Sequence, residues 1–266
     1  MHQTRLDSSS RLGETEWLLR RLLPFGTAVT SIVPSGFAAY LRILHPAHGA
    51  NEESIRWASV AAKSGRTMHR LAQFHAISRP KVELSMDAVT PPEPGNLRSD
   101  LLTNLCEVLA QHTNTSESCF FCLWEGYGWL TETQQATVVF TRTDAFRQES
   151  VPPRATDHLS PVLRAAVRNA PRVSFPYRNY LLFEGPLEAT AELGWRLSEE
   201  LFISQSPNLF WPQDQAWCVA SEIDLFCTLV AGSNELAESL IANSRLEVWR
   251  ALADDPVGAD SDEENR

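Results

Sequence analysis

Helix-like and strand-like segments follow one another along this chain in no regular order, and this constrains its fold more than any other feature of the sequence. Strict alternation of strands and helices would produce a doubly wound parallel sheet, because each helix returns the chain to the same end of the sheet. No repeat of fixed period is present either. The sequence therefore predicts an α+β fold, with mixed or mainly antiparallel sheet packed against helices.

Apolar residues at three- and four-residue spacing set the expected helices. The clearest case is a pattern in which Leu193, Leu197 and Leu201 recur every four residues. Gly65 ends another of these patterns, since glycine readily adopts the left-handed conformation that closes a helix. The predicted helices span 14–23, 51–64, 101–112, 160–169, 187–202 and 234–242.

Short apolar or alternating runs set the expected strands. Residues 216–225 alternate most regularly, so Trp217, Val219, Ile223 and Leu225 should share the face that packs into the core. A further strand should follow before the last helix. The other predicted strands span 27–34, 37–46, 118–126, 136–141 and 179–186.

The domain organisation follows from length and from two irregular stretches. We expect one integrated α+β domain over residues 1–252, since a chain of this size can bury a substantial core. Residues 87–99 hold three prolines and a glycine and form the seam if there are two subdomains. Residues 253–266 carry six carboxylates and are expected to be a disordered acidic tail.

The charge balance limits the classes of partner. The chain has 33 acidic and 23 basic residues, a formal net charge of −10, which repels nucleic-acid backbones and favours a protein partner with a basic surface. No apolar run approaches the length of a membrane span, and the N-terminal residues do not form a secretion signal. We therefore expect a cytoplasmic protein that binds neither nucleic acid nor membrane.

Familiar cofactor and metal motifs are missing from the sequence. Cys119 and Cys122 have the spacing of a redox pair or half a zinc site, but on an extended strand they would face opposite ways. No phosphate-binding loop, nucleophile elbow or metal-binding histidine frame is present. We expect no cofactor, no metal site and reduced, buried thiols.

Glu222 and Asp224 are the candidate catalytic residues. On the predicted strand they are same-face neighbours about 7 Å apart, a spacing that suits an acid/base pair or two carboxylates on a divalent cation. The more ordinary interpretation is a solvated strand face with a basic cross-strand partner, and a binding surface is the third possibility. Glu222 and Asp224 are therefore candidates for three different roles.

Four aromatic residues are candidate binding residues. Phe210 and Trp211 lie in a loop predicted between prolines, and Tyr127 and Trp129 lie among glycines. Such residues present rigid apolar surface to a ligand. The first loop could instead cover the core, and the second could be a tight hairpin connection.

Three segments carry a resemblance to a known group of proteins. LWEGYGW (123–129), NYLLFEGPLEA (179–189) and SPNLFWPQDQAWCVASEID (206–224) resemble the recurring blocks of an uncharacterised bacterial protein family. The resemblance implies an intracellular bacterial protein with one integrated fold. It implies no activity and no functional residue.

The leading hypothesis is a non-enzymatic protein-interaction module of the immunity-like or regulatory kind, because the chain is acidic, has aromatic-rich loops and lacks a catalytic frame. The alternative is a small-molecule enzyme that uses the Glu222 and Asp224 carboxylates, with or without a divalent metal. In that enzyme Phe210 or Trp211 would form an aromatic wall of the active site.

Overall fold

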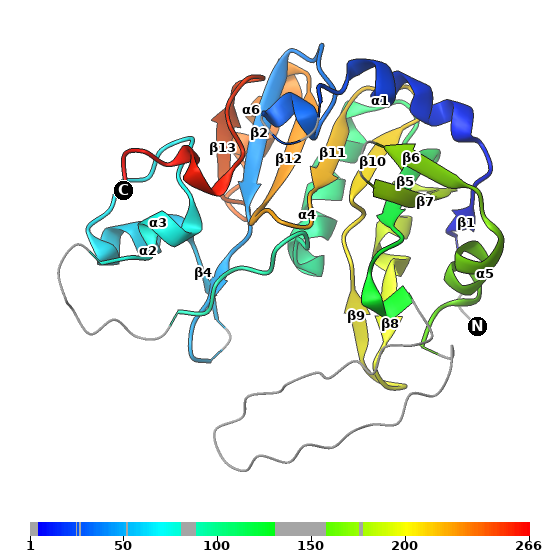
Figure 1. Ribbon diagram of the computed structural model, residues 1–266, viewed down its shortest axis with the longest axis horizontal. Coiled ribbons are helices and arrows are strands. Elements are labelled where there is room, and N and C mark those ends of the chain that lie inside the picture. Colours follow the sequence, from blue (N-terminus) through cyan, green and yellow to red (C-terminus); the bar gives the residue numbers. More distant parts are fainter. Residues whose placement is uncertain are drawn as a thin grey trace.

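The structure is a computed structural model and describes residues 5–24, 26, 28–51, 53–80, 89–130, 158–175 and 178–266. Within these residues a nine-stranded sheet has the order β1-β7-β5-β10-β11-β12-β2-β13, with β6 also paired to β7 (Figure 1). Every neighbouring pair in this sheet is antiparallel. The predicted α+β class is confirmed.

The strands of the large sheet are short and mostly buried on both sides. Two small hairpins lie outside it: β3 (Ala47–His48) with β4 (Ser54–Ile55), and β8 (Gly194–Arg196) with β9 (Phe202–Ser204). The sheet itself comprises β1 (Asp7–Ser8), β2 (Ala39–Leu44), β5 (Cys119–Trp124), β6 (Arg172–Phe175), β7 (Arg178–Gly185), β10 (Leu209–Pro212), β11 (Cys218–Ser221), β12 (Cys227–Gly232) and β13 (Val248–Ala251).

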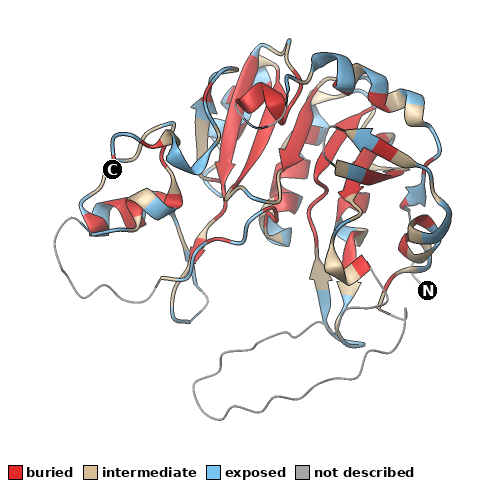
Figure 2. Cartoon of the chain, in the orientation of Figure 1, coloured by how far each residue is buried: buried red, intermediate tan, exposed pale blue. Residues whose placement is uncertain are grey.

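Helices cover both faces of the sheet, and the strands are correspondingly buried (Figure 2). Side chains of α4 (Ser99–Leu109), α5 (Pro161–Asn169) and α6 (Asn234–Ile241) belong to the core on one face. Side chains of α1 (Glu16–Arg21), α2 (Trp57–Ser64) and α3 (Phe74–Ile77) belong to the core on the other. Single 3-10 turns are η1 (Leu12–Thr15), η2 (Val29–Ser31), η3 (Ala110–His112), η4 (Gly128–Leu130), η5 (Leu187–Glu192) and η6 (Ala259–Ser261).

Strand β5 illustrates why the central strands are apolar at every position. Cys119 and Phe121 belong to the core on the α4 side, and Phe120 and Cys122 to the core on the α1 side. A sheet covered on both faces requires apolar residues on both faces of its strands. The prediction that the two cysteines of the CxxC segment face opposite ways is confirmed, and burial raises the pKa of the Cys119 thiol to about 12.

The helix predicted over 187–202 is wrong. The structure has the 3-10 turn η5, then the β8–β9 hairpin, in this stretch. Gly194 has a φ of +144°, outside the helical range, and a Cβ there would lie 2.1 Å from the backbone oxygen of Ile203. Leu193 is buried but Leu201 is an exposed hydrophobic, so the four-residue spacing does not mark one packed face.

Two segments on the α1 side also differ from prediction. Residues 27–34 were expected to form a strand, but Val29–Ser31 form η2, and the Ser31 hydroxyl donates to the Ala28 carbonyl at 2.6 Å. The helix expected from residue 51 begins only at Trp57, where the distant Glu247 carboxylate accepts the Trp57 amide at 2.8 Å. The strand predicted over 136–141 lies outside the described residues.

The acidic tail predicted to be disordered is packed against the body, so that prediction is wrong. Asp255, Asp262 and Asn265 are buried. The Asp262 carboxylate accepts from the Gln73 amide at 3.0 Å and from His69 Nε2 at 2.8 Å. Burial alone would raise the pKa of Asp262, but these hydrogen bonds lower it overall. The acidic composition suggested that these carboxylates would be exposed to water. In the structure, hydrogen-bond donors from a segment distant in sequence bind the buried carboxylates instead.

The predicted seam at 87–99 does not separate two sheets in the described structure. Strand β2, which precedes it, pairs with β12 and β13, which follow it. Within the seam the Gly95 amide donates to the Leu225 carbonyl at 2.9 Å, so this segment packs against the β11–β12 turn.

Candidate functional site

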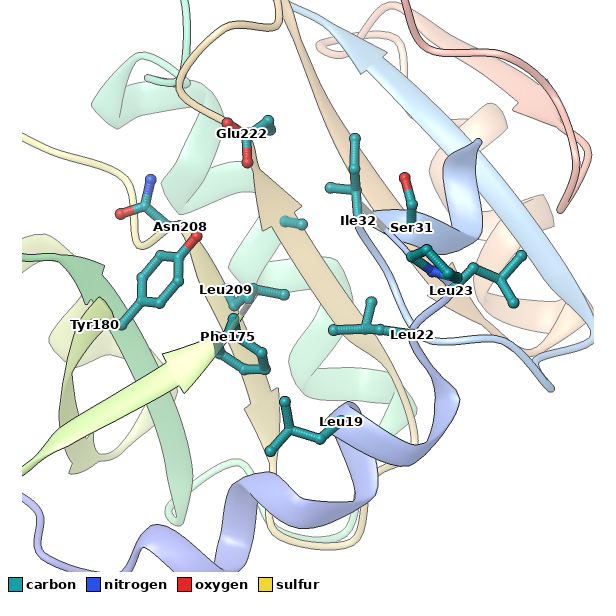
Figure 3. A pocket seen from close by; sticks show the side chains of 12 residues that line it. Leu19, Leu22, Leu23, Ser31, Ile32, Phe175, Tyr180, Asn208, Leu209 and Glu222 are labelled. Carbon is teal, nitrogen blue, oxygen red and sulfur yellow. The ribbon is translucent and has the colours of Figure 1, made fainter. Parts of the chain in front are cut away.

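A groove runs between α1 and the β6–β7 hairpin, with β10 and β11 as its floor (Figure 3). Its volume is about 370 Å³. The groove is apolar along its length and polar at one end. Its lining consists of Leu19, Leu22, Leu23, Pro24, Ser31, Ile32, Phe175, Tyr180, Asn208, Leu209, Ala220 and Glu222.

Helix α1 forms one rim of the groove. Leu18 is fully buried and holds the helix on the sheet. Trp17 packs edge-on against Trp211 beneath it, with ring centroids 6.2 Å apart. Leu19 of α1 and Leu23, two residues past the end of this helix, lie on the rim as exposed hydrophobics.

The floor and the opposite wall of the groove come from the sheet. Leu209 of β10 is paired with Ala220 of β11, and the small alanine side chain leaves space above the floor. Phe175 and Tyr180 form the wall and pack edge to face, with ring centroids 5.4 Å apart. Figure 3 shows the Tyr180 hydroxyl directed toward the polar end.

An ion pair closes the polar end. Arg178, at the start of β7, binds the carboxylate of Glu222 through Nη1 and that of Asp224 through Nη2, the latter at 3.1 Å. The Arg178 and Glu222 side chains are only 14% and 11% exposed, whereas that of Asp224 is 75% exposed. One guanidinium therefore holds a buried carboxylate and an exposed one together.

Arg178 is held in place by more than its carboxylates. Its guanidinium lies over the ring of Trp124, 5.6 Å from the centroid, a distance that permits a cation–π interaction. Burial would lower the pKa of Arg178, but the hydrogen bond with Glu222 and its charge raise it overall. This arginine is therefore a permanent cation in a defined position.

Asn208 joins three strands at the same end of the sheet. Its Oδ1 accepts the Trp124 amide of β5 at 2.7 Å, and its Nδ2 donates to the Ser221 carbonyl of β11 at 3.2 Å. The same Nδ2 donates to the Tyr127 hydroxyl at 2.9 Å. Burial raises the pKa of Tyr127 to about 12, and the pKa of Tyr180 rises for the same reason. Both phenols therefore stay neutral near neutral pH.

A second hollow of about 390 Å³ lies on the other side of Arg178. It shares Phe175 with the groove, and its other lining residues are Trp124, Glu125, Gly126, Arg178 and Asn179. Its Glu125 carboxylate accepts from Arg172 at 2.7 Å and from Asn179 at 2.9 Å. The Arg178–Glu222 ion pair therefore lies where the two hollows adjoin.

The structure corrects the predicted setting of Glu222 and Asp224. Strand β11 ends at Ser221, so both carboxylates lie in the turn to β12 rather than on one strand face. Ile223 and Leu225, expected in the core, are half-buried in the same turn. Arg178, rather than strand spacing, brings the two carboxylates together.

The predicted aromatic loop is also corrected. Phe210 and Trp211 belong to strand β10 and are almost completely buried, on opposite faces of the sheet. They build the core beneath the groove and do not line it. Tyr127 joins the polar end through Asn208. Trp129 stacks between Tyr127 and Trp195, with ring centroids 5.7 and 4.9 Å away, and lines neither hollow.

Sequence reasoning missed Arg178, Asn208 and Tyr180, which carry most of the polar contacts at this end. The sequence did predict a basic partner for Glu222, but on a strand adjacent to its own. The observed partner, Arg178, belongs to β7, which is separated from β11 by two strands. Three or more side chains able to bind one metal ion do not come together anywhere in the described residues. Nor do these residues include a helix long and apolar enough to cross a membrane.

Comparison of the chain with protein-family models, curated proteins and solved structures gives no match. The resemblance to an uncharacterised bacterial family stays a prediction. The function must therefore be inferred from the groove and its polar end.

Proposed function

We propose that this chain is a non-enzymatic protein-interaction module that binds a partner with a basic surface, and that the groove receives an apolar segment of this partner. A cytoplasmic role of the immunity-like or regulatory kind fits such binding. The observation that carries the proposal is the groove itself, an apolar hollow bordered by exposed leucines and closed at one end by carboxylates.

The rim leucines support a protein partner. Leu19 and Leu23 are 43% and 50% exposed on the same side of the groove. Covering the exposed half of each would contribute about 1 kcal/mol per side chain, from the usual value for complete burial of leucine. Apolar patches bordered by polar groups are typical of sites where another protein binds.

The charge of the chain supports a basic partner. A formal net charge of −10 accelerates encounter with a positively charged surface, and this attraction weakens as salt screens it. Glu222 lines the polar end of the groove, and Asp224, bound to the same arginine, is exposed to solvent beside it.

The enzyme alternative has less support from the same geometry. A catalytic carboxyl must exchange a proton with the substrate. Glu222 faces the groove but binds Arg178, and Asp224 is exposed and outside the lining. The pair is arranged to hold a cation rather than to transfer a proton.

Matched aspartate substitutions test the groove. The tagged protein is purified from its host under mild conditions, and the co-purifying protein is quantified for wild type, Leu23→Asp and Leu252→Asp. Leu252 is 52% exposed and does not line the groove, so it is a control for the 50% exposed Leu23. We expect a stoichiometric partner with wild type and Leu252→Asp, and at least a tenfold loss with Leu23→Asp.

A second pair of aspartate substitutions tests whether the loss of binding is specific to position 23 or common to the rim of the groove. Leu19→Asp should act like Leu23→Asp, whereas Ile241→Asp, at a similarly exposed position on α6, should act like wild type. Repeated recovery of the tagged protein alone, or equal recovery of a partner with all four variants, would contradict the proposal.

A further inference from the structure

We infer that the partner segment carries a lysine or arginine within one or two residues of its groove-filling apolar side chain, and that Asp224 binds this cation while Glu222 holds Asp224 in place through Arg178. The inference rests on the proposed function and specifies the chemistry of the partner at the same site.

Among the described residues, the charged side chains at the groove end carry a negative excess. Glu222 and Asp224 bring two negative charges, and Arg178 supplies one positive charge to both. The Glu93 carboxylate is a further negative group near this end, since its field acts on the Tyr127 hydroxyl. A cation brought by the partner would balance the remaining charge, so the groove should select a basic segment over a neutral one.

Asp224 is the carboxylate that a partner can reach. Glu222 is 11% exposed and paired with an arginine that is itself largely buried. Asp224 is 75% exposed, with one oxygen bound to Arg178 at 3.1 Å. Carboxylates have several acceptor sites, so Asp224 can bind Arg178 and a second cation at once.

The turn that carries Asp224 is held before any partner binds. The Leu225 amide donates to the Glu222 carbonyl at 3.0 Å, and the Gly95 amide donates to the Leu225 carbonyl at 2.9 Å. Arg178 adds a side-chain bond from a different part of the sheet. A carboxylate held in this way loses less conformational freedom on binding than a free surface side chain.

Cations on the other rim are already engaged. On α1, Arg20 binds Glu16 at 2.7 Å, and the guanidinium of Arg21 lies 5.7 Å from the ring centroid of Trp17. The Tyr180 phenol stays neutral, so it neither adds to nor balances the charge. Asp224 lies two positions beyond Glu222, the carboxylate that lines the polar end, and both bind Arg178, so the cation should follow closely on the apolar side chain that fills the groove.

A random twelve-residue peptide display library tests the inference. Selection on the intact protein at low salt should enrich peptides that combine an aliphatic or aromatic residue with Lys or Arg one or two positions away. The best peptide and a copy with glutamine in place of its basic residue are then measured by fluorescence anisotropy. We expect the glutamine copy to bind roughly 1.5- to 5-fold more weakly to wild type, the range of a largely exposed charge pair.

Protein variants assign the two carboxylates. Asp224→Asn should remove the preference for the basic peptide, while Asp254→Asn, which removes an equal charge at an exposed position elsewhere, should keep it. Glu222→Gln should reduce the preference in the wild-type background but not in the Asp224→Asn background. That dependence distinguishes positioning through Asp224 from a general loss of structure.

The outcomes separate the inference from the proposed function. Enriched apolar peptides that lack basic residues, and whose binding Leu23→Asp abolishes, would overturn the inference and leave the proposed function standing. Enriched peptides that bind Leu23→Asp as well as wild type would overturn the proposed function. Selections that enrich no sequence at low salt would count against both.

Discussion

Arg178 at the start of β7 binds Glu222, the residue that follows β11, although β5 and β10 lie between these two strands in the sheet. The side chains beneath this bond come from the two intervening strands: Trp124 ends β5 and Asn208 precedes β10. The ion pair therefore ties together one end of four strands, and this end is where the groove closes.

Removal of Arg178 should destabilise the fold. Arg178→Gln would leave the largely buried Glu222 carboxylate without its cation, at a cost of about 2–3 kcal/mol in the free energy of unfolding, somewhat below the range for fully buried pairs. Arg20→Gln breaks a 2.7 Å ion pair whose side chains are largely exposed and should cost less than about 0.5 kcal/mol. Urea unfolding of both variants measures the difference, and equal midpoints would show that the ion pair does not support the fold.

Gly95 should tolerate no larger residue. Its φ is +66°, and an added Cβ would lie 2.5 Å from the Cα of Ile223, a backbone atom that cannot move aside easily. Gly95→Ala should therefore lower the free energy of unfolding by about 2 kcal/mol or more. Gly13→Ala, where nothing lies within 4 Å of the added carbon, should change it by less than about 0.5 kcal/mol. A Gly95→Ala protein as stable as wild type would show that the backbone around Ile223 moves to accommodate the added carbon.

Stability should fall as the pH drops from 6.5 to 4 because of His45. This ring is buried between the Glu93 carbonyl and the Thr228 hydroxyl, and burial lowers its pKa from 6.5 to about 4. Between these values the unfolded chain binds a proton that the folded chain does not, so folding loses up to about 3 kcal/mol, nearly all of it by pH 4. Above pH 6.5 the contribution is constant.

His45→Gln tests this origin of the pH dependence. The variant should be less stable at pH 7, because the buried hydrogen bonds are disturbed. Its free energy of unfolding should nevertheless change less than that of wild type between pH 6.5 and 4, as measured by chemical unfolding across this range. An unchanged pH slope would assign the acid sensitivity to other groups.

The C-terminal segment should stabilise the body. Asp262→Ala removes the acceptor of the Gln73 amide and of His69, and should cost about 2 kcal/mol, the range of buried hydrogen bonds to a charged group. Glu263→Ala, at the next and exposed position, should cost less than about 0.5 kcal/mol. Thermal unfolding of the two variants compares them, and equal melting temperatures would mean that the segment contributes nothing to stability.

Several elements could be predicted from the sequence because short-range periodicity determines them. Helix α4 overlaps the predicted 101–112 segment, beginning two residues earlier, and buries Leu102, Leu105 and Leu109, which recur at three- and four-residue spacing. Strand β5 lies within the predicted 118–126 segment. In both, neighbours three, four or two positions apart share a face, so the information is local.

The predictions were wrong where contacts with distant residues determine the local structure. The leucines of 187–202 repeat at helical intervals, but the backbone at Gly194 and its contact with Ile203 require a hairpin. The carboxylates near the C-terminus looked like a solvated tail, yet donors nearly 200 positions away along the chain bind Asp262. Local composition contains no information about such partners.

By itself the sequence determined the α+β class, the apolar central strands and the identity of Glu222 and Asp224 as a notable pair, because these follow from residue type and spacing. Only the tertiary structure decided what surrounds that pair. Arg178 starts β7 and binds Glu222, while Asn208 precedes β10 and binds the carbonyl of the adjacent Ser221, where the strand ends align in the folded sheet. Contacts between residues this distant in sequence arise from the order and register of the strands, which no local pattern encodes.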